Sequence, residues 1–438
     1  MILKLEQRYD RIFLVIVMDV KRLIDILDVK EEQALAFCSI YKDKLEYEDL
    51  QNAIDNYCAN MVESFMENYK KELLDKYNLY KNNYDNKKII SIDAMGGDKG
   101  PNAVLGGMNQ YLYQNGEGKV FFRVFGDEKK LRKLLAKYPR VSRNCEVIHA
   151  PNVIKPTDKV MDVLRHAQDT SMYMAIKDVR EGKSAAVISA GNTGILMSLS
   201  KLALKTIDGI SRPAITTMLP SGAGDSRVVV LDLGANVQCD ETILFDFAVL
   251  GSVYAEVVGH MPKPKLGVLN IGSEETKGNE TLVHLNKVLT ENKDELPYDY
   301  IGFVEANDIS AGRVQVVVTD GFTGNIVLKT VEGTARLVKR VVVENFKKSV
   351  LAIIGAFFLI HVFKRLKHKI DPRSYAGATF LGLRGFAVKT HGNSDALAFA
   401  NSIGYTVKLT KANLNGLIDE RARALADVRA TINAEPEK

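Results

Sequence analysis

The chain has 438 residues, of which 46% are hydrophobic and 26% charged, a composition typical of globular proteins. The net charge of +5 is small and evenly spread, which argues against a nucleic-acid-binding protein, because such proteins concentrate Lys and Arg on one face. Four widely spaced cysteines, without a CxxC pair or a nearby His, predict neither a zinc site nor a disulfide framework and suit a reducing cytoplasm.

Residues 1–88 differ from the rest of the chain in texture. They contain no glycine and are rich in Lys, Asp, Asn and Tyr. Apolar residues recur at steps of three or four from Ile54 to Leu73, which predicts a helical extension of unknown role. A start site placed upstream of the true domain is the alternative. The apolar run at 13–18 is followed at once by Asp19, so we expect no signal peptide.

From residue 89 onward, short apolar runs alternate with longer amphipathic segments. The predicted strands are IISIDA (89–94), VFFRVFG (120–126), CEVIHA (145–150), AAVISAG (185–191), RVVVLDLGA (227–235), KLGVLNIG (265–272), YIGFVEA (300–306) and VQVVVTDG (314–321). Most are continuous Val, Ile and Leu runs, which indicate strands covered on both faces. The sequence therefore predicts an α/β fold with three layers, a largely parallel sheet between helices.

Small, polar and glycine residues collect after five of the predicted strands. The five loops are DAMGGD (93–98), SAGNTG (189–194), DLGAN (232–236), IGSEETKGNE (271–280) and DGFTGN (320–325). A glycine after a strand is usually only a turn, but five such loops are hard to explain as turns. Because ligands of open α/β sheets bind outside the carboxyl ends of the strands, we expect the five loops to meet at one rim.

Two of these loops run directly into predicted helices and suit a phosphate. Glycines let backbone N–H groups approach a ligand, and the helix start contributes its positive end. The residues are Ser189, Gly191, Asn192, Thr193 and Gly194 in one loop, and Gly321, Thr323, Gly324 and Asn325 in the other. Neither loop is a GxxxxGK[ST] motif, so a nucleoside triphosphate is not expected. Without a Ser/His/Asp arrangement or a catalytic-looking cysteine, direct reaction of two bound substrates is favoured over a covalent acyl-enzyme.

The motifs of the chain, taken in order, resemble those of one family. They are DAMGGD (93–98), SAGNTG (189–194), RPA (212–214), DLGAN (232–236), LNIGSEETKGNE (269–280), VVVTDGFTGNIVLK (316–329) and HGNS (391–394). This set is similar to that of the bacterial phosphate acyltransferases of the PlsX type, from about residue 88 to about 430. The resemblance implies conversion of acyl-[acyl-carrier protein] and inorganic phosphate to acyl phosphate, the first step of phosphatidic acid synthesis. It also implies a fold like that of phosphotransacetylase and isocitrate dehydrogenase, and a homodimer without a metal or other cofactor.

The resemblance assigns catalysis to Lys277 and Asn325. We expect Lys277 to neutralise the phosphate or the oxyanion, and the Asn325 amide to donate a hydrogen bond to the oxyanion. Asp93 and Asp98 would repel a bare phosphate, so we expect them to hold the glycine turn. The residues expected to bind or shape the substrate site are Asp93, Gly96, Gly97, Asp98, Ser189, Gly191, Asn192, Thr193, Gly194, Asn236, Thr323, Gly324 and His391.

The segment VLAIIGAFFLIHVF (350–363) is apolar and flanked by basic residues on both sides. A helix of this length spans about 21 Å, short of the roughly 30 Å hydrocarbon core of a bilayer. We therefore expect residues 341–371 to lie in the headgroup region of an anionic membrane; a buried core or dimer helix is the alternative. The side chains expected to contact lipid are Ile353, Ile354, Phe357, Phe358 and Ile360.

The predicted organisation is thus an extension at 1–88, a phosphate acyltransferase domain at 89–430 and a polar tail at 431–438. The partners implied by the resemblance are acyl carrier protein, inorganic phosphate, anionic lipids and a downstream glycerol-3-phosphate acyltransferase, at the inner face of the cytoplasmic membrane. Two departures weaken it: fewer basic residues between Asp158 and Ser171, where an acidic carrier would dock, and Ala376 in place of a glycine. Alternatives are a coenzyme A-dependent phosphotransacetylase, a metal-dependent hydroxyacid dehydrogenase and a non-catalytic membrane scaffold.

Overall fold

A computed structural model of the chain describes residues 87–155, 157–222, 226–348, 358–359, 361 and 377–433. These residues belong to one compact unit, Asn83–Lys438. The helical extension predicted for residues 1–88 falls outside the described residues except at its last two positions. The same holds for most of the segment predicted to contact the membrane.

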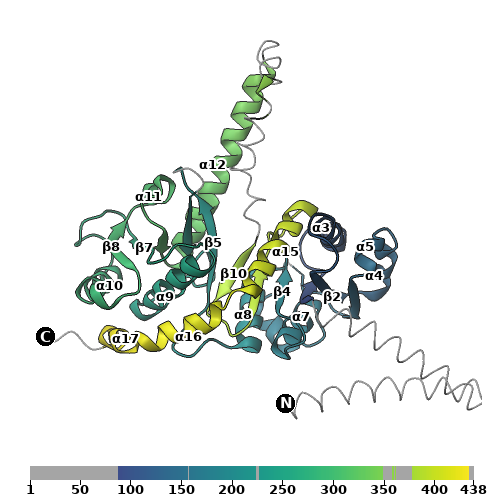
Figure 1. The fold of residues 1–438 in the computed structure, drawn as a ribbon, viewed down its shortest axis with the longest axis horizontal. Coiled ribbons are helices and arrows are strands. Elements are labelled where there is room, and N and C mark those ends of the chain that lie inside the picture. Colours follow the sequence, from purple (N-terminus) through teal and green to yellow (C-terminus); the bar gives the residue numbers. More distant parts are fainter. Residues whose placement is uncertain are drawn as a thin grey trace, which may run out of the picture. The chain divides into compact units, whose positions relative to one another are not determined.

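The described chain is built on one mixed sheet (Figure 1). Its strands are β1 (Lys88–Asp93), β2 (Val120–Gly126), β3 (Cys145–His149), β4 (Ala186–Ser189), β5 (Ala214–Pro220), β6 (Arg227–Leu231), β7 (Lys265–Leu269), β8 (Asp299–Val304), β9 (Val316–Val318), β10 (Ala378–Leu381) and β11 (Phe386–Lys389). Their order across the sheet is β3-β2-β1-β4-β11-β10-β5-β6-β9-β7-β8. Each predicted apolar run therefore forms a strand, whereas β5, β10 and β11 were not predicted.

Helices cover both faces of the sheet, which confirms the predicted three-layer α/β fold. They are α3 (Gly100–Asn115), α4 (Glu128–Leu135), α5 (Pro139–Ser142), α6 (Val160–His166), α7 (Ser171–Arg180), α8 (Thr193–Leu204), α9 (Glu241–Val257), α10 (Glu280–Glu291), α11 (Ala306–Ala311), α12 (Gly321–Lys347), α15 (Ala396–Lys411), α16 (Leu414–Ala424) and α17 (Ala426–Asn433), with a 3-10 turn at Lys293–Glu295.

Successive residues of one strand enter different cores, because side chains alternate across a strand. In β4, Ile188 packs in the core under α3, α9 and α15, while Val187 packs in the core under α7 and α8. We call these two sides the α9 face and the α8 face. Burial on both sides explains why the strands read as unbroken apolar runs.

The strands do not all run in the same direction, and the expectation of a single rim is wrong. Strand β10 is antiparallel to both β11 and β5, and β5 is antiparallel to β6. As a result β1, β4 and β11 end at one edge of the sheet, whereas β6, β7 and β9 end at the opposite edge. The DAMGGD and SAGNTG loops therefore leave one edge, and the other three loops leave the opposite edge.

Helix α12 starts at the second of these edges. It begins after β9 with Asp320 as its N-cap, and Val327 and Leu328 pack against the core of the α8 face. Only Gly321 and Gly324 are buried among its residues, because the later turns lead away from the sheet (Figure 1). Within the described ranges, no helix is sufficiently long and apolar to span a bilayer.

Candidate functional site

Asp93 lies at the carboxyl end of β1 and is buried on the α8 face. Its carboxylate accepts hydrogen bonds of 2.7 Å from the hydroxyls of Ser171 and Ser189, and one of 3.3 Å from the Met95 N–H. Burial raises the pKa of Asp93, and the two serine hydroxyls oppose this rise. The carboxylate therefore joins β1, β4 and the first turn of α7.

The glycine turn after Asp93 packs tightly on two other loops. Gly97 has φ of +85°, and a Cβ there would lie 2.8 Å from the Gly392 carbonyl oxygen, so no other residue fits without strain. The Asp98 N–H donates to the same carbonyl at 2.8 Å. The HGNS loop, with His391, is thus brought against the DAMGGD loop. Gly96 faces the backbone of Gly191 in the third loop of this edge.

The SAGNTG loop leads into α8. Its Gly191 N–H donates to the Ser189 hydroxyl at 3.0 Å, and the Asn192 side chain caps the helix by accepting from the Ile195 N–H at 3.1 Å. Thr193 and Gly194 form the first turn of α8. The predicted residues of this loop are therefore assembled beside Asp93 at a helix start, where an anion is stabilised.

At the opposite edge, a second buried carboxylate organises the DLGAN loop. Asp232 is fully buried and accepts from the N–H groups of Gly234 at 3.2 Å and Asn236 at 2.6 Å, and from the Asn236 amide at 2.9 Å. It also accepts from the Ile215 N–H at 3.0 Å, which ties the loop to the start of β5. Asn236 was predicted as a site residue, whereas the aspartate that holds it was not. Burial raises the pKa of Asp232, and its hydrogen bonds oppose the rise.

The start of α12 packs directly on this loop. The Gly321 N–H donates to the Asn236 carbonyl at 2.7 Å, and Asn325 lies over Gly234, where a Cβ would come within 3.5 Å of the Asn325 amide carbon. The Thr323 hydroxyl donates to Asp320 at 2.9 Å. The side chain of Asn325 is exposed, and this leaves its amide open to a ligand.

Lys277 lies in the loop between β7 and α10, with an exposed side chain. Its N–H donates to the Glu274 carbonyl at 3.0 Å, and its carbonyl accepts from the Asn270 amide at 2.8 Å. Because β7 and β9 are parallel neighbours, Lys277 and Asn325 leave the same edge of the sheet. The hydrogen bonds of Lys277 to Glu274 and Asn270 do not reach Asn325.

A basic side chain follows Asn325 on α12. Lys329 follows Asn325 by four residues and so shares its side of the helix. Burial lowers the pKa values of Lys389 and His391, which lie at and just after the end of β11, and the charge of Lys329 adds to this lowering. Lys329 and Lys389 were not predicted; the position of Lys389 two residues before the HGNS loop was the available signal.

A covalent acyl-enzyme on a cysteine finds no support in the described residues. Cys239 is partly buried near Asp232 and Asp320, and burial raises the pKa of its thiol to about 12. Burial does the same for Cys145. Both thiols are protonated at neutral pH and are poor nucleophiles. Among the described residues, no three His, Cys, Asp or Glu side chains are grouped as a metal site requires.

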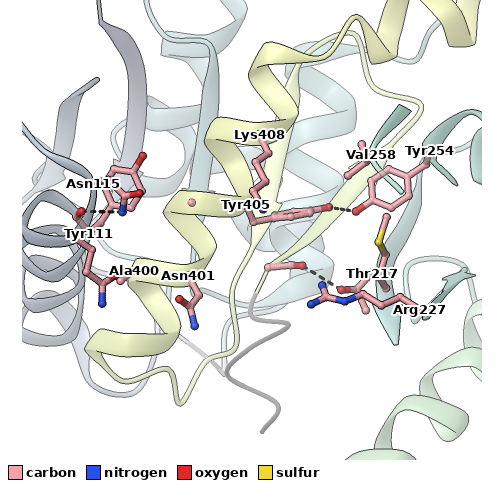
Figure 2. Close-up of a pocket in the computed structure, with 14 residues that line it drawn as sticks. Tyr111, Asn115, Thr217, Arg227, Tyr254, Val258, Ala400, Asn401, Tyr405 and Lys408 are labelled. Carbon is pink, nitrogen blue, oxygen red and sulfur yellow. Dashed lines mark hydrogen bonds between the residues drawn. The ribbon is translucent and has the colours of Figure 1, made fainter. Parts of the chain in front are cut away.

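A cavity of about 370 Å³ lies away from these loops, on the α9 face (Figure 2). Tyr111 of α3, Arg227 of β6 and Lys408 of α15 contribute to its wall. In its wall, the hydroxyls of Tyr254 and Tyr405 form a partly buried hydrogen bond of 2.7 Å. None of the predicted site residues lines this cavity.

Comparison with known proteins decides the family. The model of the family described as "Fatty acid synthesis protein" matches residues 88–416. The phosphate acyltransferase of Paramagnetospirillum magneticum is 44% identical over 75% of this chain and 92% of its own length. The chain belongs to the phosphate acyltransferase family. That of Rhodospirillum centenum is also 44% identical, over 78% of this chain and 95% of its own length.

Members of the phosphate acyltransferase family are acyltransferase enzymes. The fold has its counterpart among solved structures in a phosphotransacetylase from Streptococcus pyogenes. The TM-score is 0.51 at 14% identity, over 76% of this chain and 97% of that protein. This likeness agrees with the fold class predicted from the sequence, and at this identity it concerns the fold alone.

Proposed function

We propose that the chain transfers the acyl group of acyl-[acyl-carrier protein] to inorganic phosphate, forming acyl phosphate and free carrier protein. The observation that carries the proposal is the position of Asn325. Its exposed amide lies in the first turn of α12, over the glycine of a loop that a buried aspartate holds in place. A rigidly held donor of this kind suits an oxygen that gains negative charge during the reaction.

The proposed reaction is a direct attack on the thioester. A phosphate oxygen forms a bond to the carbonyl carbon, the C–S bond breaks, and the electron pair leaves on the carrier's sulfur, which then takes up a proton. Phosphate is partly dianionic near neutral pH and needs no covalent intermediate. The Asn325 amide donates to the oxyanion, and Lys277 neutralises the phosphate or the oxyanion. The protonated state of Cys145 and Cys239 supports this direct route.

The glycine loops at the β1 and β4 ends supply the remaining parts of the site. In the proposal, Asp93, Gly96, Gly97 and Asp98 shape the pocket, and the loop from Ser189 to Gly194 presents backbone donors at the start of α8. Asn236, Thr323 and Gly324 support the start of α12. His391 lies beside the same loops, and burial lowers its pKa, so it acts as a neutral hydrogen-bonding group.

The replacements Lys277→Met and Asn325→Leu test the assignment. Loss of one oxyanion donor costs roughly 100- to 1000-fold in kcat, so we expect a loss of that order for Asn325→Leu. Both side chains are exposed, and we expect the melting temperature to be unchanged. Lys287→Met on α10, where the lysine pairs only with Glu291 at the surface, is the control. Near-normal acyl phosphate formation in both site variants would refute these roles.

The acyl donor distinguishes the alternatives. Long-chain acyl-[acyl-carrier protein], acetyl-coenzyme A and each donor without phosphate are incubated with the full chain, and the products are identified by mass spectrometry. We expect acyl phosphate from the carrier-bound donor only. Product from acetyl-coenzyme A alone would indicate phosphotransacetylase activity, and no product with any donor would leave a non-catalytic scaffold.

The proposal extends to membrane docking and dimerisation. Phe358 and Leu359 are 76% and 47% exposed, which supports contact with the headgroup region of an anionic membrane, where a downstream glycerol-3-phosphate acyltransferase would receive the product. Ile353, Ile354, Phe357 and Ile360 lie outside the described residues. Exposed apolar side chains on α12, including Leu337, Val338 and Val341, support a homodimer at the inner face of the cytoplasmic membrane.

A further inference from the structure

Three polar side chains stand in a row at the ends of neighbouring strands. Asp93 of β1 pairs in register with Ser189 of β4, and Ser189 pairs with Lys389 of β11. Residues paired in register project to the same face of a sheet. The residues before them, Ile92, Ile188 and Val388, all pack in the core of the α9 face, so the row projects to the α8 face, where α12 lies.

Lys389 ends this row in a position that favours an anion. Its side chain is partly buried, and its ammonium donates to the Thr390 carbonyl. An ammonium has three N–H donors, so two are left for a ligand. Asp93, the nearest acid of the row, already accepts from two serine hydroxyls and a backbone N–H.

Helix α12 also carries basic side chains, Lys329 and Arg336. Lys329 follows Val327 and Leu328, which pack on the core of the α8 face. Burial lowers the pKa values of Lys389 and His391, and the charge of Lys329 adds to both effects, while Glu332 opposes the lowering at His391. Lys329 shares Glu332 with Arg336, at 3.1 Å and 3.9 Å, so one acid serves two cations there. Two like charges near each other are destabilising unless an anion compensates them. Neither lysine has a role in the function proposed above.

We propose that Lys389, with Lys329 facing it from α12, holds the inorganic phosphate that attacks the thioester. The inference rests on the proposed function and specifies its phosphate site. Lys389 approaches from the edge where β1, β4 and β11 end, and Lys329 lies one helical turn beyond Asn325. Phosphate between the two lysines would thus be placed next to the oxyanion donor, which gives α12 a role in aligning the two substrates.

The variants Lys389→Met, Lys389→Arg and Lys329→Met test this site, with Lys287→Met as the matched control. Two measurements are made on the full chain: the KM for phosphate at saturating acyl donor, and phosphate binding by calorimetry without donor. Loss of a charged hydrogen bond weakens binding by about tenfold or more. We expect that increase in the KM and Kd of phosphate for Lys389→Met, a smaller one for Lys329→Met and partial recovery with Lys389→Arg, while the donor KM is unchanged.

The outcomes separate this inference from the proposed function. Unchanged phosphate KM and Kd in a folded Lys389→Met protein would overturn the site while acyl phosphate formation stands. If the wild type binds phosphate through Lys389 but makes no acyl phosphate, the reaction is wrong and the anion site stands. Should Lys389→Met fail to fold, Lys329→Met is the deciding variant, because Lys329 is exposed and can be replaced without loss of packing. An unchanged phosphate KM in Lys329→Met would then overturn the proposed site.

The pH dependence provides a readout that a purely structural role would not affect. Burial and the charge of Lys329 lower the pKa of Lys389 to about 8, and Asp98 and Asp93 oppose the shift. Lys389 is therefore charged below this pH and loses its charge above it. We expect kcat/KM for phosphate to fall as the pH rises through about 8 in the wild type. Lys389→Arg should abolish this fall, since arginine stays charged; an unchanged profile in that variant would contradict the role.

Discussion

Asp232 and Gly324 form the tightest junction of the site. The helix start comes so close to the loop that a Cβ at Gly324 would lie 1.9 Å from the Asp232 carbonyl oxygen. The same aspartate holds the loop through four backbone N–H groups, from Ile215, Gly234, Ala235 and Asn236. The position of Asn325 thus depends on Gly324, because only glycine lets the helix approach the loop so closely.

Gly324→Ala should separate the helix from the loop and lower both stability and activity. Because the clash is with backbone, we expect a loss of about 2–3 kcal/mol in the free energy of unfolding and a fall in kcat. Gly333→Ala is the control on the same helix, since its Cβ would meet nothing within 4 Å. That change should stabilise the protein by about 0.5–1 kcal/mol. Denaturant titration measures both, and equal stability of the two variants would contradict the close approach.

Helix α12 combines two functions along its length. Its first turns are fixed by the Asp320 cap, by the Asp232 loop and by packing of Val327 and Leu328. Its later turns have no buried residue and carry exposed apolar side chains, leading to the segment proposed to contact lipid. One end of the element therefore holds the substrates, and the other end is available to a partner chain or a membrane.

Replacement of both Phe357 and Phe358 by Glu should abolish membrane binding. Two charged side chains in an apolar segment oppose insertion among lipid tails, and they also repel an anionic surface. Flotation with vesicles containing anionic lipid measures binding, and acyl phosphate formation in the absence of vesicles should be unchanged. Phe322→Glu, at an exposed site at the other end of α12, serves as the control for flotation. Flotation of the double variant at the wild-type level would rule out the proposed segment.

Removal of residues 1–86 tests the organisation of the whole chain. The family match begins at residue 88 and the described compact unit at Asn83. We expect the chain from residue 87 onward to fold, since the strands and both cores described here lie within it. Its melting temperature and its rate of acyl phosphate formation should equal those of the full chain. A marked loss of either would assign the first residues a part in the fold or the site.

Much of the fold could be predicted because the apolar pattern of each short segment indicates whether that segment is buried. The unbroken run VVVL in β6 and the helix start after the glycines of DGFTGN need no knowledge of distant residues. Strands β5 and β10 escaped prediction because Thr216, Thr217 and Thr379 interrupt their apolar pattern. Lys389 was not predicted for another reason. From sequence alone, a lysine at the end of a short apolar run is interpreted as solvent-exposed, and only the paired strands show its neighbours.

Local sequence was enough for the α/β class, the loops that carry the chemistry and the resemblance to phosphate acyltransferases, because apolar periodicity and glycine-rich turns are properties of short segments. The direction of the strands depended on pairings between distant segments, such as Phe380 with Ile215 and Lys389 with Ser189. Those pairings place the loops at two opposite edges of the sheet, and the start of α12 packs on the DLGAN loop at one of them. Packing of the completed chain, which no single segment encodes, therefore decides which side chains face one substrate.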